Sequence, residues 1–249
     1  MNPASFRSQI FPMFPGRCLL LTAALLCSAQ KAPVPSPEMA PTGTLKGWYV
    51  LLSSADIGNP AIAGSAKSIP GGLQVTAGGK DIWGFTDQFR FTYEKRAGDF
   101  DVAVRVESLA APHLYTRAGI MARADLSPGS RHVIFLVFPD NRPRHNNTSA
   151  YELQYRETND GDSKAIYPPH EAGTPPMFPV EFPDAWLRLK REGNQFTGFV
   201  STDGEHWKKY SSYSLDLPDT ILLGLAVTSH TAEASTTATF GNLRVIHDN

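Results

Sequence analysis

Planar hydrogen-bonding side chains recur at alternate positions in two short runs of this chain. In one run Arg117 and Arg123 alternate with alanine and isoleucine, and in the other Gln154 and Arg156 alternate with leucine and tyrosine. Residues two apart in a strand share a face, so the apolar sets should enter a core and leave the polar sets on an open sheet face. Guanidinium and amide groups on such a face can hold sugar hydroxyls or carboxylates. The alternative is a solvated face whose charges form only cross-strand ion pairs.

Aromatic side chains in predicted loops are candidates for stacking surfaces. Trp83 stands next to Gly84, and Tyr167, His170 and Phe178 lie in a proline-rich segment. An exposed tryptophan can stack on the apolar C–H face of a pyranose ring, whereas a tryptophan in a core or at a sheet edge only packs. The second group could build another platform for a sugar, or it could pin its own segment to the body of the protein.

Familiar catalytic patterns are absent from the sequence. It contains no G-x-S-x-G elbow and no H-E-x-x-H pair. No strand carries the two spaced carboxylates that concanavalin-like glucanases place across a glycosidic bond. Asp99 and Asp101 share a strand face but read as solvated surface carboxylates. An enzyme acting on sugars would therefore have to draw its carboxylates from separate loops, for instance Asp87 and Glu171.

Metal ligands are sparse. His145, His170 and His230 are scattered without a short ligand spacing. Asp160 and Asp162 flank a glycine in a loop, but this stretch lacks the ligand count of a calcium loop. The sequence predicts no cofactor and leaves calcium open.

The elements that must position these residues are short β-strands. Twelve segments have strand-like composition and alternation, and little of the chain has helical periodicity. This pattern predicts an all-β sandwich rather than a barrel or an α/β fold. The expected strands are Trp48–Leu52, Gly72–Thr76, Gln88–Glu94, Asp99–Ser108, Ala118–Ala124, His132–Phe138, Ser149–Glu157, Ala185–Arg191, Gln195–Ser201, Trp207–Ser214, Ile221–Thr228 and Ser235–Ile246.

Two connections stand out from this regular pattern. Ser201, Asp203, Gly204 and Trp207 resemble the aspartate box of sialidase-like propellers with one residue missing, and we interpret them as a hairpin turn. The segment 139–183 contains eight prolines and one expected strand. Long irregular segments in compact domains are often functional or mobile.

The N-terminal region predicts export. A basic start with Arg7 and Arg17 precedes a short apolar run that ends at Cys27-Ser28-Ala29, which is typical of a cleaved signal peptide over 1–29. Lipid attachment at Cys27 ranks second, because the leucine before it is larger than lipoprotein processing prefers. Both cysteines, Cys18 and Cys27, would be lost with the signal, so no disulfide is expected. A proline-rich linker should follow over 30–46, and one domain over 47–249.

The charge balance argues against nucleic acid as a partner. The chain has a net charge of −1, and removal of 1–29 takes away two of the 23 basic residues and none of the 24 acidic ones, which leaves −3. The sequence has no basic block that could follow a phosphate backbone.

A set of short motifs resembles a known family. The motifs are Asp81–Gly84, Gln88-Phe89, Gly98–Phe100, Arg105-Val106, Arg117–Arg123, Ser201–Gly204 with Trp207, Gly224–His230 and Ala238–Phe240. With them the sequence is similar to the uncharacterised bacterial concanavalin A-like family whose usual label mentions regulation of enolase, and to the accessory sandwich at the C-terminus of some β-xylosidases. The resemblance covers about Gly47 to Val245 and implies a two-sheet jelly roll, often secreted and often attached to carbohydrate-active proteins. Segment 139–183 is longer than the usual turn in that family.

These observations predict a secreted or periplasmic, monomeric, non-catalytic β-sandwich that binds a glycan or another envelope polymer, without a transmembrane segment. The alternatives are a sugar-active enzyme and a structural or partner-binding envelope protein, which would show a flat apolar patch instead of a pocket. The expected polar contacts are Arg117, Arg123, Gln154 and Arg156, and the expected stacking surfaces are Trp83 and Tyr167.

Overall fold

The computed structural model describes residues 38–39, 52–168 and 177–246. The predicted signal peptide, both cysteines, His170 and Glu171 lie outside these residues. The described residues belong to one unit, Ser36–Asn249, and contain seventeen strands and no helix. None of them therefore forms a helix that could cross a bilayer.

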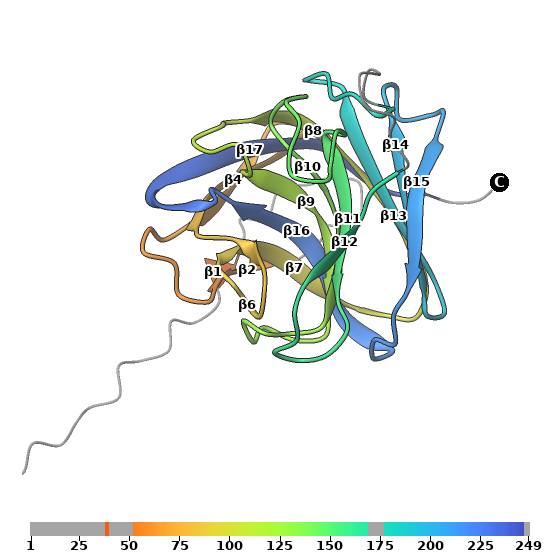
Figure 1. The fold of residues 1–249 in the computed structure, drawn as a ribbon, viewed down its shortest axis with the longest axis horizontal. Helices are drawn as coiled ribbons and strands as arrows, with labels where there is room; N and C mark the ends of the chain where they lie inside the picture. The colour runs from red at the N-terminus through yellow and green to blue at the C-terminus, as the bar shows by residue number, and fades with distance from the viewer. Residues whose placement is uncertain (1–37, 40–51, 169–176, 247–249) are drawn as a thin grey trace, which may run out of the picture. The chain divides into compact units, whose positions relative to one another are not determined.

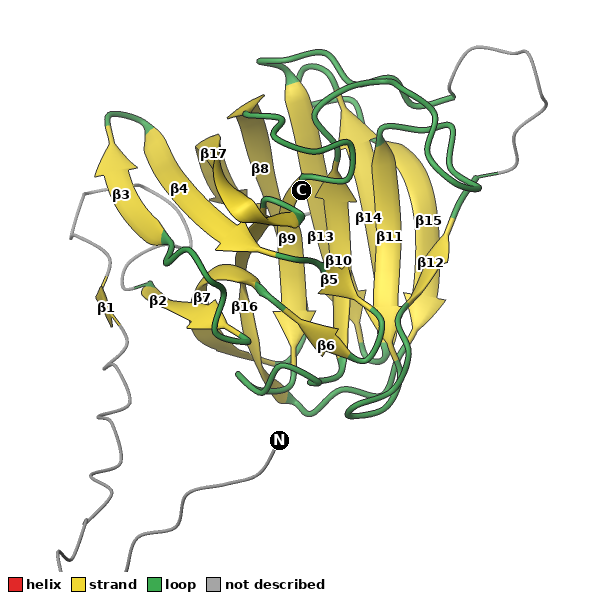
Figure 2. Cartoon of the chain, turned by 60° about the vertical axis from the view of Figure 1, so that its left-hand side comes forward, coloured by secondary structure: helices red, strands yellow, loops and turns green. Residues whose placement is uncertain are grey.

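The strands form two large antiparallel sheets and one small hairpin, as Figures 1 and 2 show. The eight-stranded sheet has the order β1-β2-β7-β16-β9-β10-β11-β12, and the seven-stranded sheet has the order β15-β14-β13-β8-β17-β4-β3. Strands β5 and β6 form the hairpin. The bounds are β1 Glu38–Met39, β2 Ser53–Ile57, β3 Ser65–Ile69, β4 Gly72–Gly79, β5 Ile82–Trp83, β6 Thr86–Asp87, β7 Phe89–Ala97, β8 Phe100–Leu109, β9 Arg117–Arg123, β10 His132–Val137, β11 Tyr151–Arg156, β12 Lys164–Ile166, β13 Ala185–Glu192, β14 Gln195–Ser201, β15 Lys208–Ser214, β16 Thr220–Thr228 and β17 Thr231–Val245.

The sandwich core lies between the two sheets and confirms the predicted alternation. Ala118 and Ile120 of β9 and Leu153 of β11 enter this core, where they join Val104 of β8 and Leu187 of β13. Apolar residues at every second position of paired strands bury one continuous face, and this burial is the main force that holds the sheets together.

The opposite face of the eight-stranded sheet is also covered, which corrects one expectation. Met121 of β9 and Ile134 of β10 pack in a second apolar cluster with Ile82 of the β5–β6 hairpin. Arg117 is 3% exposed, and Arg123 is fully buried. The polar row of β9 was expected on an open face, but the hairpin, which ends 30 positions before β9 begins, folds over it.

Six short strands were not predicted. Strands β2 and β3 have the sequences SSADI and SAKSI, which lack the β-branched and aromatic density of ordinary strands. They form because β7 and β4 offer free edges to any extended neighbour. Within the expected linker 30–46, β1 pairs with β2 in the same way. The hairpin β5–β6 and strand β12 are too short to leave a periodic signal.

The 201–207 segment forms the predicted hairpin turn. The Asp203 carboxylate accepts bonds from the backbone N–H groups of Glu205 and His206, both at 2.8 Å. Gly204 has a φ of 76°, and a Cβ there would stand 2.7 Å from the Trp186 indole. Glycine is therefore required both by the backbone conformation and by the close approach of the ring.

The described part of segment 139–183 is tied to the sandwich. Phe178 is 4% exposed and packs in the sandwich core, so it pins the segment and does not form a sugar platform. The side-chain amide of Asn141 forms two hydrogen bonds with the backbone of Val180. Its oxygen accepts from the Val180 N–H at 2.7 Å, and its nitrogen donates to the Val180 carbonyl at 2.9 Å.

Candidate functional site

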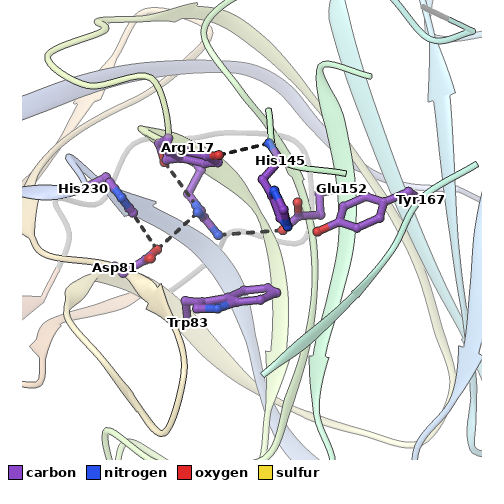
Figure 3. A pocket seen from close by; sticks show the side chains of 8 residues that line it. Asp81, Trp83, Arg117, His145, Glu152, Tyr167 and His230 are labelled. Carbon is purple, nitrogen blue, oxygen red and sulfur yellow. Dashed lines mark hydrogen bonds and ion pairs between the residues drawn. The ribbon is translucent and has the colours of Figure 1, made fainter. Parts of the chain in front are cut away.

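A pocket of about 220 Å³ opens beside the β5–β6 hairpin, on the face of the eight-stranded sheet that points away from the sandwich core. Its walls come from segments that are far apart in the sequence (Figure 3). This volume is below the roughly 300–1,000 Å³ of pockets for drug-sized ligands. The lining residues are Asp81, Trp83, Tyr115, Arg117, His145, Glu152, Tyr167 and His230.

Arg117 of β9 organises the polar side of the pocket. Its Nη2 lies 3.2 Å from Asp81 Oδ1, and its Nη1 donates to Gln154 Oε1 at 2.9 Å. Its Nε donates to the Tyr115 carbonyl at 3.2 Å. The guanidinium also lies 5.4 Å from the centre of the Phe138 ring, a cation–π contact. These contacts fix the arginine before any ligand arrives.

Asp81 and His230 form one rim of the pocket. His230 Nδ1 lies 3.2 Å from Asp81 Oδ1, and Ile82 N–H donates to the same carboxylate oxygen at 2.7 Å. Burial alone would raise the pKa of Asp81, but the Arg117 guanidinium and His230 outweigh it and hold this pKa below its ordinary value. Asp81 is thus ionised at neutral pH.

Glu152 of β11 lies at the other end of the guanidinium. It is 5% exposed, and its Oε1 stands 3.8 Å from Arg117 Nη1 without a hydrogen bond. Its Oε2 receives a long bond of 3.5 Å from the Asn147 amide. Burial raises the pKa of Glu152, and Arg117 offsets this effect only in part.

The hairpin that carries Trp83 is anchored through its backbone. The Ile82 carbonyl accepts bonds from the Gln154 amide and from Arg117 Nη1. The Gly84 carbonyl accepts from Arg156 Nη2 at 2.9 Å and from the Ser163 backbone N–H at 3.0 Å. The Trp83 side chain is 38% exposed, so the anchored hairpin presents its indole at the pocket.

Asp87 of β6 is the centre of a buried charge network beneath the exposed part of the hairpin. Arg156 binds the Asp87 carboxylate with both terminal nitrogens, at 2.8 and 2.7 Å. Arg123 Nη1 lies 3.7 Å and His132 Nδ1 lies 3.8 Å from Asp87 Oδ2. All four side chains have no exposure. One carboxylate therefore serves two arginines in the interior, where leaving any of them unpaired would be costly.

Some of the ligand contacts predicted from the sequence line the pocket, and the others lie in the residues that hold its walls. Trp83, Arg117 and Tyr167 line the pocket, and Gln154 lies behind Arg117. Arg123 and Arg156 were expected on the same open face, but both are fully buried around Asp87. They hold the hairpin that covers them, so no ligand in the pocket reaches them. Asp87 is equally enclosed, which removes it from the pair of loop carboxylates considered for an enzyme.

Five lining residues were not predicted as contacts: Asp81, Tyr115, His145, Glu152 and His230. Glu152 could have been predicted from the sequence, because it shares the polar face of β11 with Gln154. The others come from loops and strand ends that only the tertiary fold brings together. Among the described residues, no group of three or more histidines or acidic side chains is arranged to hold a metal ion.

The buried imidazole of His132 makes a prediction about pH and stability. Burial lowers the pKa of His132 to about 4, although Asp87 opposes this effect. In the unfolded chain a histidine binds its proton near pH 6.5, so between pH 6.5 and 4 the unfolded state holds more protons than the fold. The free energy of unfolding should therefore fall as the pH drops, by about 2 kcal/mol between pH 7 and pH 5.

Urea unfolding of the wild type and of His132→Asn at both pH values measures this effect. The variant should lose about 2 kcal/mol less than the wild type over this range. His206→Asn is the matched control, because His206 is exposed and Asp203 raises its pKa. A raised histidine pKa gives stability that is lost as pH rises, so this control should keep the full loss at low pH. Equal losses in the wild type and His132→Asn would contradict the prediction.

The topology and the comparison with solved structures define a β-sandwich of two antiparallel sheets. A functionally unknown protein from Saccharomyces cerevisiae is similar over 79% of this chain and 97% of its own, with 20% identity and a TM-score of 0.56. A GH43 protein from Bacillus licheniformis is similar over 73% of this chain but only 34% of its own, with 14% identity and a TM-score of 0.51. At such identities the likeness shows the fold alone.

A carbohydrate-binding module from Bacillus subtilis also matches, over 78% of this chain and 95% of its own, with 13% identity and a TM-score of 0.49. No family model matches the chain. No curated protein matches it either.

Proposed function

We propose that this protein is an exported, non-catalytic module that binds one sugar residue of a glycan in the pocket beside Trp83. The observation that carries the proposal is the pairing of two kinds of wall in one small pocket. The indole of Trp83 and the ring of Tyr167 are apolar surfaces on which sugar C–H groups can pack. Asp81 and Glu152, which lie on either side of Arg117, supply charged hydrogen-bond acceptors for the hydroxyls.

The volume of the pocket favours the end of a glycan chain over its middle. About 220 Å³ suits a ligand of about one sugar ring, whereas an internal segment of a polymer needs an open groove along its length. The family proposed for the chain, the concanavalin A-like family labelled for regulation of enolase, is consistent with this role. The export signal proposed over 1–29 would bring the module to extracellular or envelope glycans.

A binding measurement on two tyrosine variants tests the proposal. Calorimetric titration with a panel of neutral monosaccharides and polysaccharides should show saturable binding at millimolar sugar. Tyr167→Ala should weaken it about tenfold, because one apolar wall is lost. Tyr213→Ala is the matched control, because Tyr213 stacks on Tyr155 outside the pocket with ring centroids 3.6 Å apart. The proposal fails if no sugar saturates the wild type, or if both variants bind alike.

A sugar-cleaving enzyme is the second candidate, and one observation favours it. Asp81 and Glu152 line the same pocket, and their surroundings push their pKa values in opposite directions, below and above the ordinary carboxyl range. This division is typical of an ionised base paired with a proton donor. Release of nitrophenol from aryl glycosides by the wild type, and its loss in Asp81→Asn, would favour the enzyme over the binding module.

A further inference from the structure

One carboxylate oxygen of Glu152 lacks a hydrogen-bond donor within the described part of the chain, and this restricts which ligands fit the pocket. Glu152 Oε1 is buried, lines the pocket and has no hydrogen-bond donor among the described residues. Because a buried acceptor without a partner is costly, a ligand that supplies a donor there gains affinity. A sugar can supply such a donor through a hydroxyl or an ammonium group.

The positive charge of the pocket is not available to an acidic ligand. Arg117 is paired with Asp81 at 3.2 Å, and Gln154 and the Tyr115 carbonyl take further donors of the same guanidinium. Nearby Arg144 is paired with Asp140 at 3.0 Å. The pocket therefore holds two carboxylates against one guanidinium. Arg117 is the one arginine or lysine among the described residues that line the pocket, so an entering carboxylate would face Glu152 with none of these cations left unpaired.

We infer that the pocket selects a non-anionic sugar, whose hydroxyl or ammonium group donates to Glu152 Oε1, and that it rejects uronic acids. This inference rests on the proposed sugar-binding function and names the ligand class of the same site. Specificity here comes from an unfavourable charge against the wrong ligand as well as from a new bond to the right one.

Matched sets of sugars separate these contributions. We would titrate the protein with glucose, glucuronate and glucosamine, and with the corresponding galactose and mannose sets, at pH 7, where an ordinary imidazole is mostly neutral and the amine of the amino sugar is mostly an ammonium. In the set that binds best, the uronate should bind at least tenfold more weakly than the neutral sugar. Tighter binding of the amino sugar would identify an ammonium as the donor, and equal or weaker binding would identify a hydroxyl.

Two variants then assign the rejection to the carboxylates. Glu152→Gln keeps the shape but removes the charge, so the penalty on the uronate should fall to threefold or less. Asp81→Asn should reduce the penalty as well, and it serves if Glu152→Gln does not fold. Equal or tighter binding of the uronate by the wild type would overturn this inference and leave the proposed function standing. Binding of no sugar in any set would overturn the proposed function and this inference together.

Discussion

Replacing Asp87 by asparagine should lower the free energy of unfolding by about 3–5 kcal/mol, the largest stability effect that we expect from a change of this size. The substitution keeps the volume of the side chain but removes the charge that balances Arg123 and Arg156. Both arginines have no exposure, so neither can regain water without opening the fold. The bidentate bond from Arg156 would also lose one of its two acceptors.

Urea unfolding of the wild type and Asp87→Asn measures this effect, with Glu157→Gln as the control. Glu157 pairs with Lys164 at 2.7 Å, but both side chains are about half exposed, and exposed pairs contribute about 1 kcal/mol or less. A loss below about 1 kcal/mol in Asp87→Asn would show that the buried network is not what fastens the hairpin to the sheet.

Replacing Trp83 by alanine should have the opposite profile, a large loss of binding with little loss of stability. An aromatic residue at the centre of a binding pocket contributes about 2 kcal/mol, so sugar affinity should fall about 30-fold. The hairpin should keep its place, because the Ile82 and Gly84 carbonyls anchor it and the indole does not. Stability should therefore change by about 1 kcal/mol or less.

Phe85→Ala is the matched control for this experiment. Phe85 lies on the same hairpin and is 64% exposed, but it does not line the pocket. Its removal should leave affinity unchanged within about twofold. If Trp83→Ala binds the same sugar as well as Phe85→Ala does, the indole is not a contact surface and the proposed pocket is misplaced.

The sequence predicted the sandwich because period-two alternation is a local signal. The apolar set of β9 enters the sandwich core as expected, and the continuous apolar run of β10 divides between that core and the second apolar cluster. The burial of Arg123 and Arg156 could not be predicted in the same way. It depends on a hairpin of two-residue strands that is held by long-range contacts to Ile82, Gly84 and Asp87.

The candidate site was predicted only where a residue type carries its own signal. Trp83 stands beside a glycine, Tyr167 lies in an expected loop, and Arg117 lies on the polar face of an expected strand. Asp81 and His230 are 149 positions apart in the chain and meet because Thr231 of β17 pairs with Gly79 of β4. No local sequence pattern predicts a contact between residues so far apart in the chain.

The anchoring of the β5–β6 hairpin separates two properties that usually change together. Buried side chains hold the hairpin by its backbone carbonyls at Ile82 and Gly84, and those carbonyls are the same whatever residue stands at position 83, 85 or 86. Trp83, Phe85 and Thr86 are all exposed. These three positions can therefore be randomised in a library without loosening the attachment, which makes the hairpin a natural place to evolve new ligand preferences on an unchanged scaffold.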